Sequence, residues 1–257
     1  MSSVLRSVTA WRHSLESILS LAQELSDPDW SAPTECPKWT VKDVYAHLVE
    51  GERWMAAGHP QLPDLTHWTE QGVLAWRDHS PLEVATALRR AYEQRCYQLA
   101  RRPVDPQAPA YLPMGQRSTL ARLLQIRVLD VWVHEQDIRR AVGRPGNLAS
   151  PGAAVAGDLF VAAFPRIVAK LAQALPGSVV RLTTRGEVSI DVAVATDRRG
   201  VGALVTPGRT ATTHLIISWE AYTRLSCGRG TSDDYDVRII GDRGLAERIL
   251  GHLSITP

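Results

Sequence analysis

The sequence predicts an α+β protein of two domains, an amino-terminal four-helix bundle followed by a domain with an antiparallel sheet. The chain of 257 residues is long for one hydrophobic core, since single domains commonly span ~100–200 residues. Its first half repeats apolar residues at helical spacing, whereas its second half alternates them at strand spacing. A linker rich in Gly, Pro, Ser and Ala, GRPGNLASPGAA, separates the halves. We therefore expect domains at residues 1–146 and 147–257.

Four amphipathic helices of similar length are expected in the first half, which favours an up-down bundle. They cover residues 7–25, 40–58, 80–102 and 117–143. Thr40, Ser80 and either Ser118 or Thr119 are suitable amino-terminal caps, and Gly143 is a suitable stop. The longer connections between these helices are expected to cover one end of the bundle.

The second half changes its pattern along the chain. It opens with an apolar helix over residues 154–175, followed by two alternating runs at 178–186 and 187–197 that indicate a hairpin. Residues 212–229 and 236–253 each have the pattern of a strand that enters a helix. An antiparallel sheet packed beside its helices is the architecture that this order favours.

Composition and charge exclude several classes of function. The net charge of +2, from 29 basic and 27 acidic residues, provides no basic stripe for nucleic acid. No signal peptide is evident, and no apolar run approaches the ~18–20 residues that a membrane span needs. Three widely spaced cysteines suit neither a disulfide framework nor a Cys-x-x-Cys metal site, which indicates the reducing cytoplasm. We expect a monomeric enzyme or small-ligand binder.

The stretch LDVWVHEQDIRRAVGRP carries a polar stripe within an apolar helix. Asp130, His134 and Asp137 share one helical face at spacings of four and three, and His47 lies among apolar residues of the second helix. If these helices are neighbours, His47, Asp130 and His134 supply the ligands of a catalytic zinc site or of non-haem iron. Alternatively, the histidines are hydrogen-bonded core residues and Asp130 pairs with a nearby arginine, Arg127 or Arg139. The spacing alone leaves both interpretations open.

Three neighbouring acidic residues, Asp137, Glu50 and Glu135, are assigned different roles. Asp137 can accept a hydrogen bond from a ligand histidine and set its tautomer, or form a salt bridge with Arg140. Glu50, one turn after His47, can act as a base on metal-bound water or thiol. Glu135 is expected to point to a different, solvated face of its helix.

The loop before the second helix contains Cys36 and Trp39. Cys36 can be a nucleophile, but a loop cysteine with no base nearby in the sequence is expected to be structural. Trp39 is expected to anchor the core.

Four segments together resemble the mycothiol-dependent maleylpyruvate isomerase family of actinobacteria. They are APTECPKWTVKDVYAHLVEGE, LDVWVHEQDIRRAVGRPG, ISWEAYTRLSCGRG and GDRGLAERILGHLSITP. The first two are similar to the family signatures Cys-Pro-x-Trp-Thr-Val-x-Asp-Val-x-x-His-Leu and Asp-x-x-x-His-x-x-Asp. The resemblance runs in order along nearly the whole chain. It implies a DinB-like bundle and a carboxy-terminal domain similar to sterol-carrier proteins.

The resemblance also implies a divalent metal, normally zinc, with Ni²⁺ or Fe²⁺ as alternatives, held by His47, Asp130 and His134. One departure is Asp130, where the resemblance leads us to expect glutamate. The resemblance further implies a functional arginine in the second domain, and Arg224 and Arg229 are the candidates here.

The function expected from this resemblance uses mycothiol as a nucleophile or cofactor. The protein is expected to be an S-transferase or a cis–trans isomerase of a small electrophilic acid. Two alternatives stay open, because one fold hosts many reactions. The first is a ligand-binding protein without catalysis, whose metal site is structural or vestigial. The second is a metal-dependent hydrolase that uses water in place of the thiol.

Overall fold

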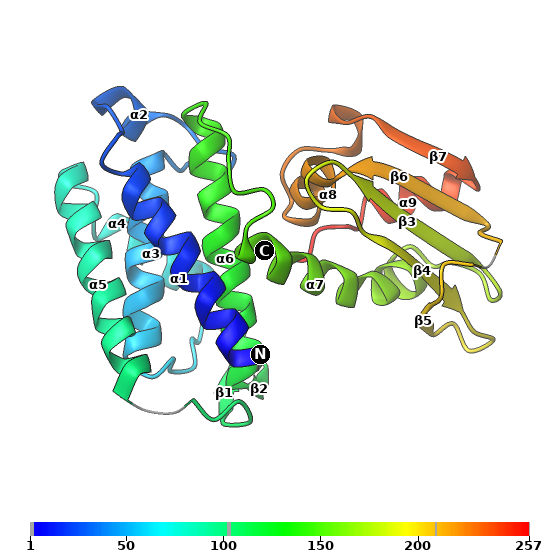
Figure 1. Cartoon of the computed structure of the whole chain (residues 1–257), viewed down its shortest axis with the longest axis horizontal. Coiled ribbons are helices and arrows are strands. Elements are labelled where there is room, and N and C mark those ends of the chain that lie inside the picture. Colours follow the sequence, from blue (N-terminus) through cyan, green and yellow to red (C-terminus); the bar gives the residue numbers. More distant parts are fainter. Residues whose placement is uncertain (1–2, 102–103, 209, 257) are drawn as a thin grey trace. The chain divides into compact units, whose positions relative to one another are not determined.

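The computed structural model describes residues 3–101, 104–208 and 210–256 (Figure 1). These residues divide into two compact units, Met1–Ala156 and Gly157–Pro257. The division falls within a helix, α7 (Pro151–Arg166), whereas the sequence suggested a boundary after residue 146.

The first unit is built on four long helices that run alongside one another (Figure 1). These helices are α1 (Ser3–Leu21), α3 (Val41–Ala56), α5 (Pro81–Arg101) and α6 (Leu120–Ala141). Helix α1 packs against α6 and α3 against α5, and α3 also contacts α6. The four helices match the four expected segments within a few residues, and Arg102, the last residue of the third segment, lies outside the described residues.

The caps of these helices agree with the sequence analysis. Thr40 and Thr119 accept backbone hydrogen bonds at the starts of α3 and α6. The Ser80 side chain accepts from the backbone N–H of Glu83 at 3.3 Å, which caps α5. Each cap satisfies a donor that the first helical turn leaves unpaired.

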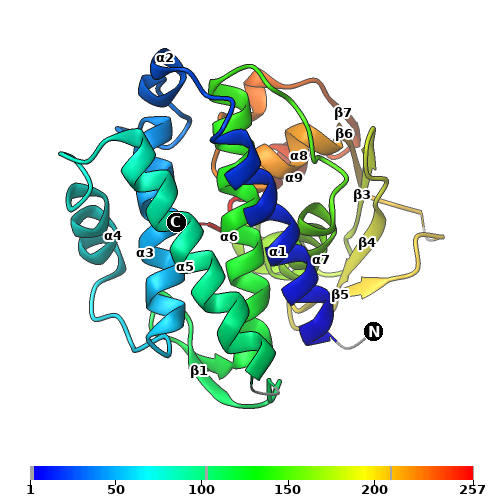
Figure 2. The same cartoon turned by 60° about the vertical axis from the view of Figure 1, so that its left-hand side comes forward.

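Smaller elements occupy the connections. Helix α2 (Asp27–Ser31) follows α1, α4 (Leu65–Leu74) packs beside α3, and the hairpin β1 (Pro109–Tyr111) and β2 (Arg117–Thr119) precedes α6 (Figure 2). The sequence pattern predicts loops in these regions, because each element is too short to show a clear period.

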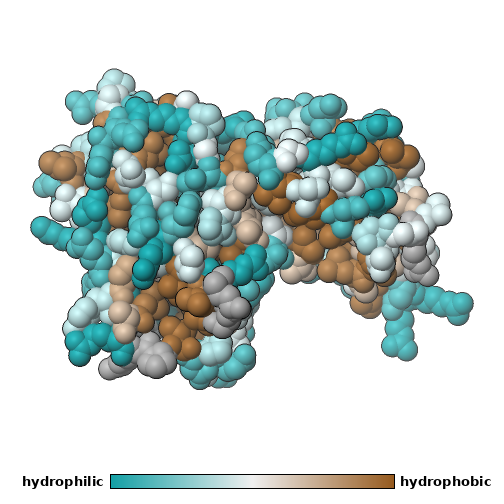
Figure 3. Space-filling view, viewed as in Figure 1, coloured by the Kyte–Doolittle hydropathy of each residue, from teal (hydrophilic) through white to brown (hydrophobic). Residues whose placement is uncertain are grey.

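The core of the first unit is formed by apolar residues at helical spacing on the facing sides of the bundle. Tyr45 of α3 is fully buried, packs against the Trp30 ring at 4.6 Å and donates to the Ile18 carbonyl at 2.7 Å. Polar and charged residues cover most of the outer face of the helices in the view of Figure 3. This amphipathic pattern explains why the period alone located the helices.

The second unit contains a five-stranded sheet in the order β5-β4-β3-β6-β7. Its strands are β3 (Val179–Arg185), β4 (Asp191–Thr196), β5 (Gly202–Val205), β6 (Thr213–Ser218) and β7 (Val237–Gly241). Three pairings are antiparallel, but β3 and β6 are parallel. The sheet is therefore mixed rather than purely antiparallel, since alternation predicts strands but does not predict which strand lies beside which.

Besides residues 157–166 of α7, the described part of the second unit contains two helices, a π-helical turn and a short 3-10 turn, Ser232–Asp234. Helices α8 (Trp219–Ser226) and α9 (Arg243–Leu250) follow β6 and β7 directly, as the strand-to-helix patterns predict, and the turn Ile167–Leu171 continues α7. Trp219 and Tyr222 of α8 pack with Phe160 of α7, with ring centroids 5.8–6.4 Å apart.

One helical stretch among the described residues, Pro151–Leu171, is long and apolar enough to cross a membrane by length and composition. No such run was expected from the sequence. In the structure 61% of the apolar window is buried, which is typical of a core helix.

Candidate metal centre

Two neighbouring helices carry the polar residues of the candidate site. A capping box fixes the start of α3, in which the Thr40 side chain accepts from the Asp43 backbone and the Asp43 side chain accepts from the Thr40 backbone. His47 follows about two turns into this helix. Helix α6 presents Asp130, His134 and Asp137 on one face, as the spacing of four and three predicts.

The structure brings His47, Asp130 and His134 together. His47 Nε2 lies 3.4 Å from Asp130 Oδ1, and His134 Nε2 lies 3.6 Å from the same oxygen. The three donor atoms lie within 4.8 Å of one another, and the imidazole centroids are 4.8 Å apart. One carboxylate oxygen therefore faces both imidazole Nε2 atoms.

The second oxygen of Asp130 has a different partner. Oδ2 accepts a close charged hydrogen bond from the Arg127 guanidinium, one turn earlier on α6. Burial raises the pKa of the Asp130 carboxyl, but Arg127 and the two histidines outweigh burial and hold that pKa well below its usual range. The arginine pairing considered as an alternative is thus present, and it leaves Oδ1 directed at the histidines.

The other nitrogen of His134 is held by Asp137. His134 Nδ1 lies 3.0 Å from Asp137 Oδ2, and only 2% of Asp137 is exposed. Cys36 Sγ donates to the same carboxylate oxygen at 3.2 Å and lies 3.8 Å from His134 Nδ1. Because Nδ1 is occupied in this way, the Nε2 of His134 is the nitrogen that faces Asp130.

The two histidines differ in their proton affinity. Burial lowers the pKa of His134, but the hydrogen bonds with Asp137 and Cys36 and the charge of Asp130 outweigh burial and raise that pKa to about 10. Burial lowers the pKa of His47, and Asp130 only partly offsets this. At neutral pH His134 is therefore the imidazole that carries the extra proton.

Cys36 and Trp39 lie closer to the site than their loop position suggested. Cys36 has no base near it in the sequence, but in the fold α6 places Asp137 beside it. The Trp39 ring lies over both imidazoles, with centroids 5.2 Å from His47 and 6.0 Å from His134. A Cys36–His134–Asp137 group and the His47–Asp130–His134 group are the two sets of metal-ligand type among the described residues.

Glu50 belongs to neither set in the described part of the chain. Its Oε1 accepts from the Trp76 indole N–H at 2.9 Å and from Arg53 at 2.8 Å. Glu135, expected on a solvated face, is instead completely buried and pairs with Arg139 at 2.9 Å. Glu52, which no sequence pattern singled out, is a fully buried carboxylate of α3 that pairs with Arg127 at 2.9 Å.

The two candidate arginines lie in the second unit. Arg224 donates a hydrogen bond to the Tyr235 hydroxyl and lies 5.5 Å from the centre of that ring. Arg229 donates to the Cys227 carbonyl at 2.7 Å.

The donor set fits a catalytic divalent metal. Two imidazole nitrogens and one carboxylate oxygen are a common protein ligand set for catalytic zinc and for non-haem iron, with a position left for water or substrate. The outer hydrogen bond from His134 to Asp137 matches the usual support of a ligand histidine. The fold and the site thus define a helical-bundle protein with a candidate metal centre, joined to an α+β unit.

The chain belongs to the mycothiol maleylpyruvate isomerase family. The model of the mycothiol maleylpyruvate isomerase N-terminal domain matches residues 11–139. This range contains His47, Asp130, His134 and Asp137. The family consists of mycothiol-dependent, metal-binding enzymes, and the protein is an enzyme of the isomerase or transferase kind.

Solved structures support the fold along both units. The chain is similar to a crystal structure of the mycothiol-dependent maleylpyruvate isomerase, with 14% identity and a TM-score of 0.60, over 93% of this chain and 95% of that chain. A histidine-to-alanine mutant of that isomerase gives 13% identity and a TM-score of 0.59, over 92% and 93% of the two chains. No curated protein matches the sequence.

Proposed function

We propose that the protein is a metal-dependent enzyme that uses mycothiol as a nucleophile toward a small electrophilic acid. His47, Asp130 and His134 would hold the metal, with zinc as the favoured ion. The observation that carries the proposal is the convergence of both imidazole Nε2 atoms on one oxygen of Asp130, at 3.4 and 3.6 Å. Family membership supports mycothiol as the thiol.

The chemistry follows from the donor set and its surroundings. When bound, a divalent metal lowers the pKa of a coordinated thiol and so supplies thiolate near neutral pH. Asp137 orients the His134 ring through Nδ1, and the Trp39 ring packs against both imidazoles. These residues hold the reacting groups in place rather than attacking the substrate themselves.

Two reactions are open to a thiolate at this site. In an isomerisation, sulfur bonds to one alkene carbon and the alkene electron pair moves onto the conjugated carbonyl group. Rotation about the new single bond and expulsion of the thiolate then restore the alkene in its trans form. In an S-transfer the carbon–sulfur bond remains, and either a proton adds to the neighbouring carbon or a leaving group departs with its bonding electrons.

An arginine of the second unit would bind the substrate carboxylate in this proposal. A guanidinium is suited to this role because it donates two parallel hydrogen bonds to a carboxylate. Arg224 and Arg229 remain the two candidates. Cys36, Cys96 and Cys227 form no disulfide in the described part of the chain, which supports a cytoplasmic location.

The test is a turnover assay with the zinc-loaded protein, mycothiol and two electrophiles, a cis-enoyl acid and a haloalkyl acid. We expect a trans acid or a thioether product only when metal and mycothiol are both present. His47→Ala should abolish product, whereas His67→Ala, at an exposed histidine of α4, should not. Hydrolysis that needs metal but no thiol would instead identify a hydrolase. Tight binding of the acid without any turnover would identify a ligand-binding protein.

A further inference from the structure

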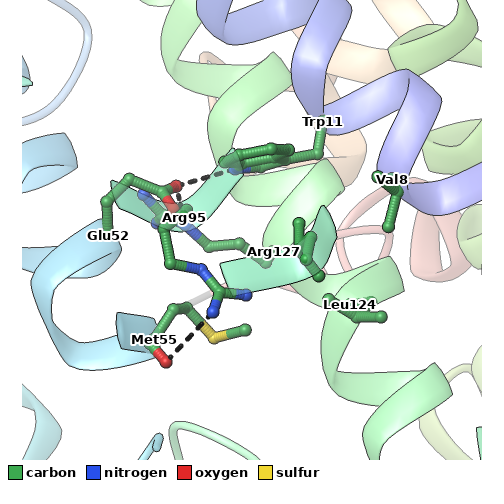
Figure 4. A pocket seen from close by; sticks show the side chains of 8 residues that line it. Val8, Trp11, Glu52, Met55, Arg95, Leu124 and Arg127 are labelled. Atoms are coloured by element: carbon green, nitrogen blue, oxygen red, sulfur yellow. Dashed lines mark hydrogen bonds and ion pairs between the residues drawn. The ribbon is translucent and has the colours of Figure 1, made fainter. Parts of the chain in front are cut away.

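A buried chain of polar contacts leads from α1 to the candidate metal centre. Glu52 Oε1 accepts from the Trp11 indole N–H and from Arg127 Nε, both at 2.9 Å (Figure 4). Arg127 in turn donates to Asp130 Oδ2. Glu52 is completely buried and Arg127 is 7% exposed, so solvent does not compete for the contacts of Glu52, whereas the side chain of Asp130, at the end of the chain of contacts, is 31% exposed.

Every nitrogen of the Arg127 guanidinium donates a hydrogen bond. Nε donates to Glu52, one terminal nitrogen donates to Asp130, and the other donates to the Leu48 carbonyl of α3 at 3.3 Å. Gly51 provides the space for this group, since a Cβ at that position would lie 2.6 Å from Arg127 Cζ. The arginine is therefore clamped between α3 and α6.

This clamp decides which oxygen of Asp130 faces the histidines. With Oδ2 fixed by Arg127, Oδ1 is the atom that lies 3.4 Å from His47 and 3.6 Å from His134. A short aspartate side chain has few rotamers, so fixing one of its oxygens also fixes the direction of the other.

We propose that Glu52 and Arg127 are positioning residues that hold Asp130 Oδ1 in its metal-binding orientation, an inference that rests on the proposed function. Arg127 acts through its fork of hydrogen bonds and not through charge alone. Glu52 acts on Asp130 only through Arg127. Neither residue contacts the substrate or the metal in this proposal.

The first unit contains a second buried glutamate–arginine pair, comparable to Glu52 and Arg127, which includes none of the proposed metal ligands. Glu135 of α6 is also completely buried, and its Oε1 also accepts from an arginine Nε at 2.9 Å, that of Arg139. In both Glu52 and Glu135 the second carboxylate oxygen is buried without a hydrogen-bond partner among the described residues. Glu135→Gln is therefore the control for Glu52→Gln.

The experiment measures Co²⁺ binding to the full chain by chelator competition and by the visible absorption of the bound ion. Two variants, Arg127→Lys and Gly51→Ala, disturb the guanidinium fork without changing any charge, and alanine is well tolerated in a helix. Loss of an outer partner of a metal ligand typically weakens binding 10–100-fold. We expect Arg127→Lys, Gly51→Ala and Glu52→Gln to weaken Co²⁺ binding by about ten-fold or more and to alter its absorption spectrum.

The control separates positioning from general stability. Glu135→Gln should lower the urea midpoint of unfolding by about as much as Glu52→Gln, yet bind Co²⁺ within about two-fold of wild type and with an unchanged spectrum. Equal Co²⁺ affinity in wild type, Arg127→Lys, Gly51→Ala and Glu52→Gln would overturn the positioning role and leave the proposed function intact. A wild-type chain that binds no Co²⁺ at all would overturn both.

Discussion

Asp137 Oδ2 lies 3.0 Å from His134 Nδ1, while the opposite nitrogen of the same ring, Nε2, lies 3.6 Å from Asp130 Oδ1. The imidazole is thus held between two carboxylates of its own helix. One carboxylate orients the ring and the other shares the candidate metal site with it. This division of roles leads to the first prediction.

Asp137→Asn should weaken metal binding without removing a ligand. The amide attracts the Nδ1 proton less strongly than the carboxylate, so the imidazole becomes a poorer and less well oriented donor. We expect zinc affinity to fall by about 10–100-fold, measured by chelator competition. Asp78→Asn, at an exposed position of the first unit, is the control and should not change affinity. If Asp137→Asn binds zinc as tightly as the wild type, Asp137 does not support the metal site.

Metal binding should release a proton and strengthen as the pH rises. The pKa of His134 is raised to about 10 in the metal-free protein, so its Nε2 is protonated at neutral pH and must lose that proton to bind metal. The apparent affinity should therefore rise up to about ten-fold per pH unit between about pH 6 and about pH 8. Calorimetry in buffers of different ionisation enthalpy counts the protons released. A flat pH profile with no proton release would contradict this account.

Cys36→Ala should retain metal binding and thiol-dependent turnover. Cys36 Sγ lies on the Nδ1 side of His134, whereas the proposed metal ligand is Nε2. The cobalt-loaded wild type, without added thiol, should accordingly lack the near-ultraviolet absorption of a sulfur ligand. Loss of turnover in Cys36→Ala with full metal occupancy would make Cys36 the nucleophile instead.

Thr40→Ala should destabilise the first unit through the start of α3. It removes the hydroxyl that accepts from the Asp43 backbone N–H, which costs about 1 kcal/mol of unfolding free energy for a typical cap. Urea unfolding followed by tryptophan fluorescence measures the change. Thr66→Ala, at an exposed position of α4, should have little effect. The cap prediction is wrong if the two variants unfold at the same urea concentration.

Replacement of the substrate-binding arginine should raise KM for the acidic electrophile and leave metal affinity unchanged. We expect either Arg224→Met or Arg229→Met to raise KM about ten-fold or more, since charge-assisted hydrogen bonds contribute about 1.5–3 kcal/mol. Steady-state kinetics with an acid and its uncharged amide distinguish carboxylate binding from a general loss of structure. If neither variant affects the acid more than the amide, both arginines are excluded from this role.

Much of the first unit was predictable because its determinants are local. Apolar residues at a period of 3.6 located the four long helices, and Thr40 and Thr119 marked two of their starts. The stripe of Asp130, His134 and Asp137 on one face likewise follows from helix geometry. The pairing of α3 with α6, which brings His47 to that stripe, had to be assumed.

Contacts between distant segments explain what the sequence did not reveal. Cys36 and Asp137 are 101 residues apart, so no local pattern could connect them. Glu52 was missed as a buried charge because its arginine partner lies 75 residues away, and Glu135 because Ser17, which also donates to it, lies 118 residues away. Similarly, the parallel pairing of β3 with β6 depends on strand order, which alternation does not encode.

The measurement that tests the central claim most directly is the metal content of the protein purified without chelator. It should be compared with a His47→Ala, His134→Ala double variant prepared in the same way. We predict about one zinc per wild-type chain and none in the double variant, as expected for a site with these ligands. A metal-free wild type that also fails to take up added zinc, nickel or iron would contradict the metal centre and the function built on it.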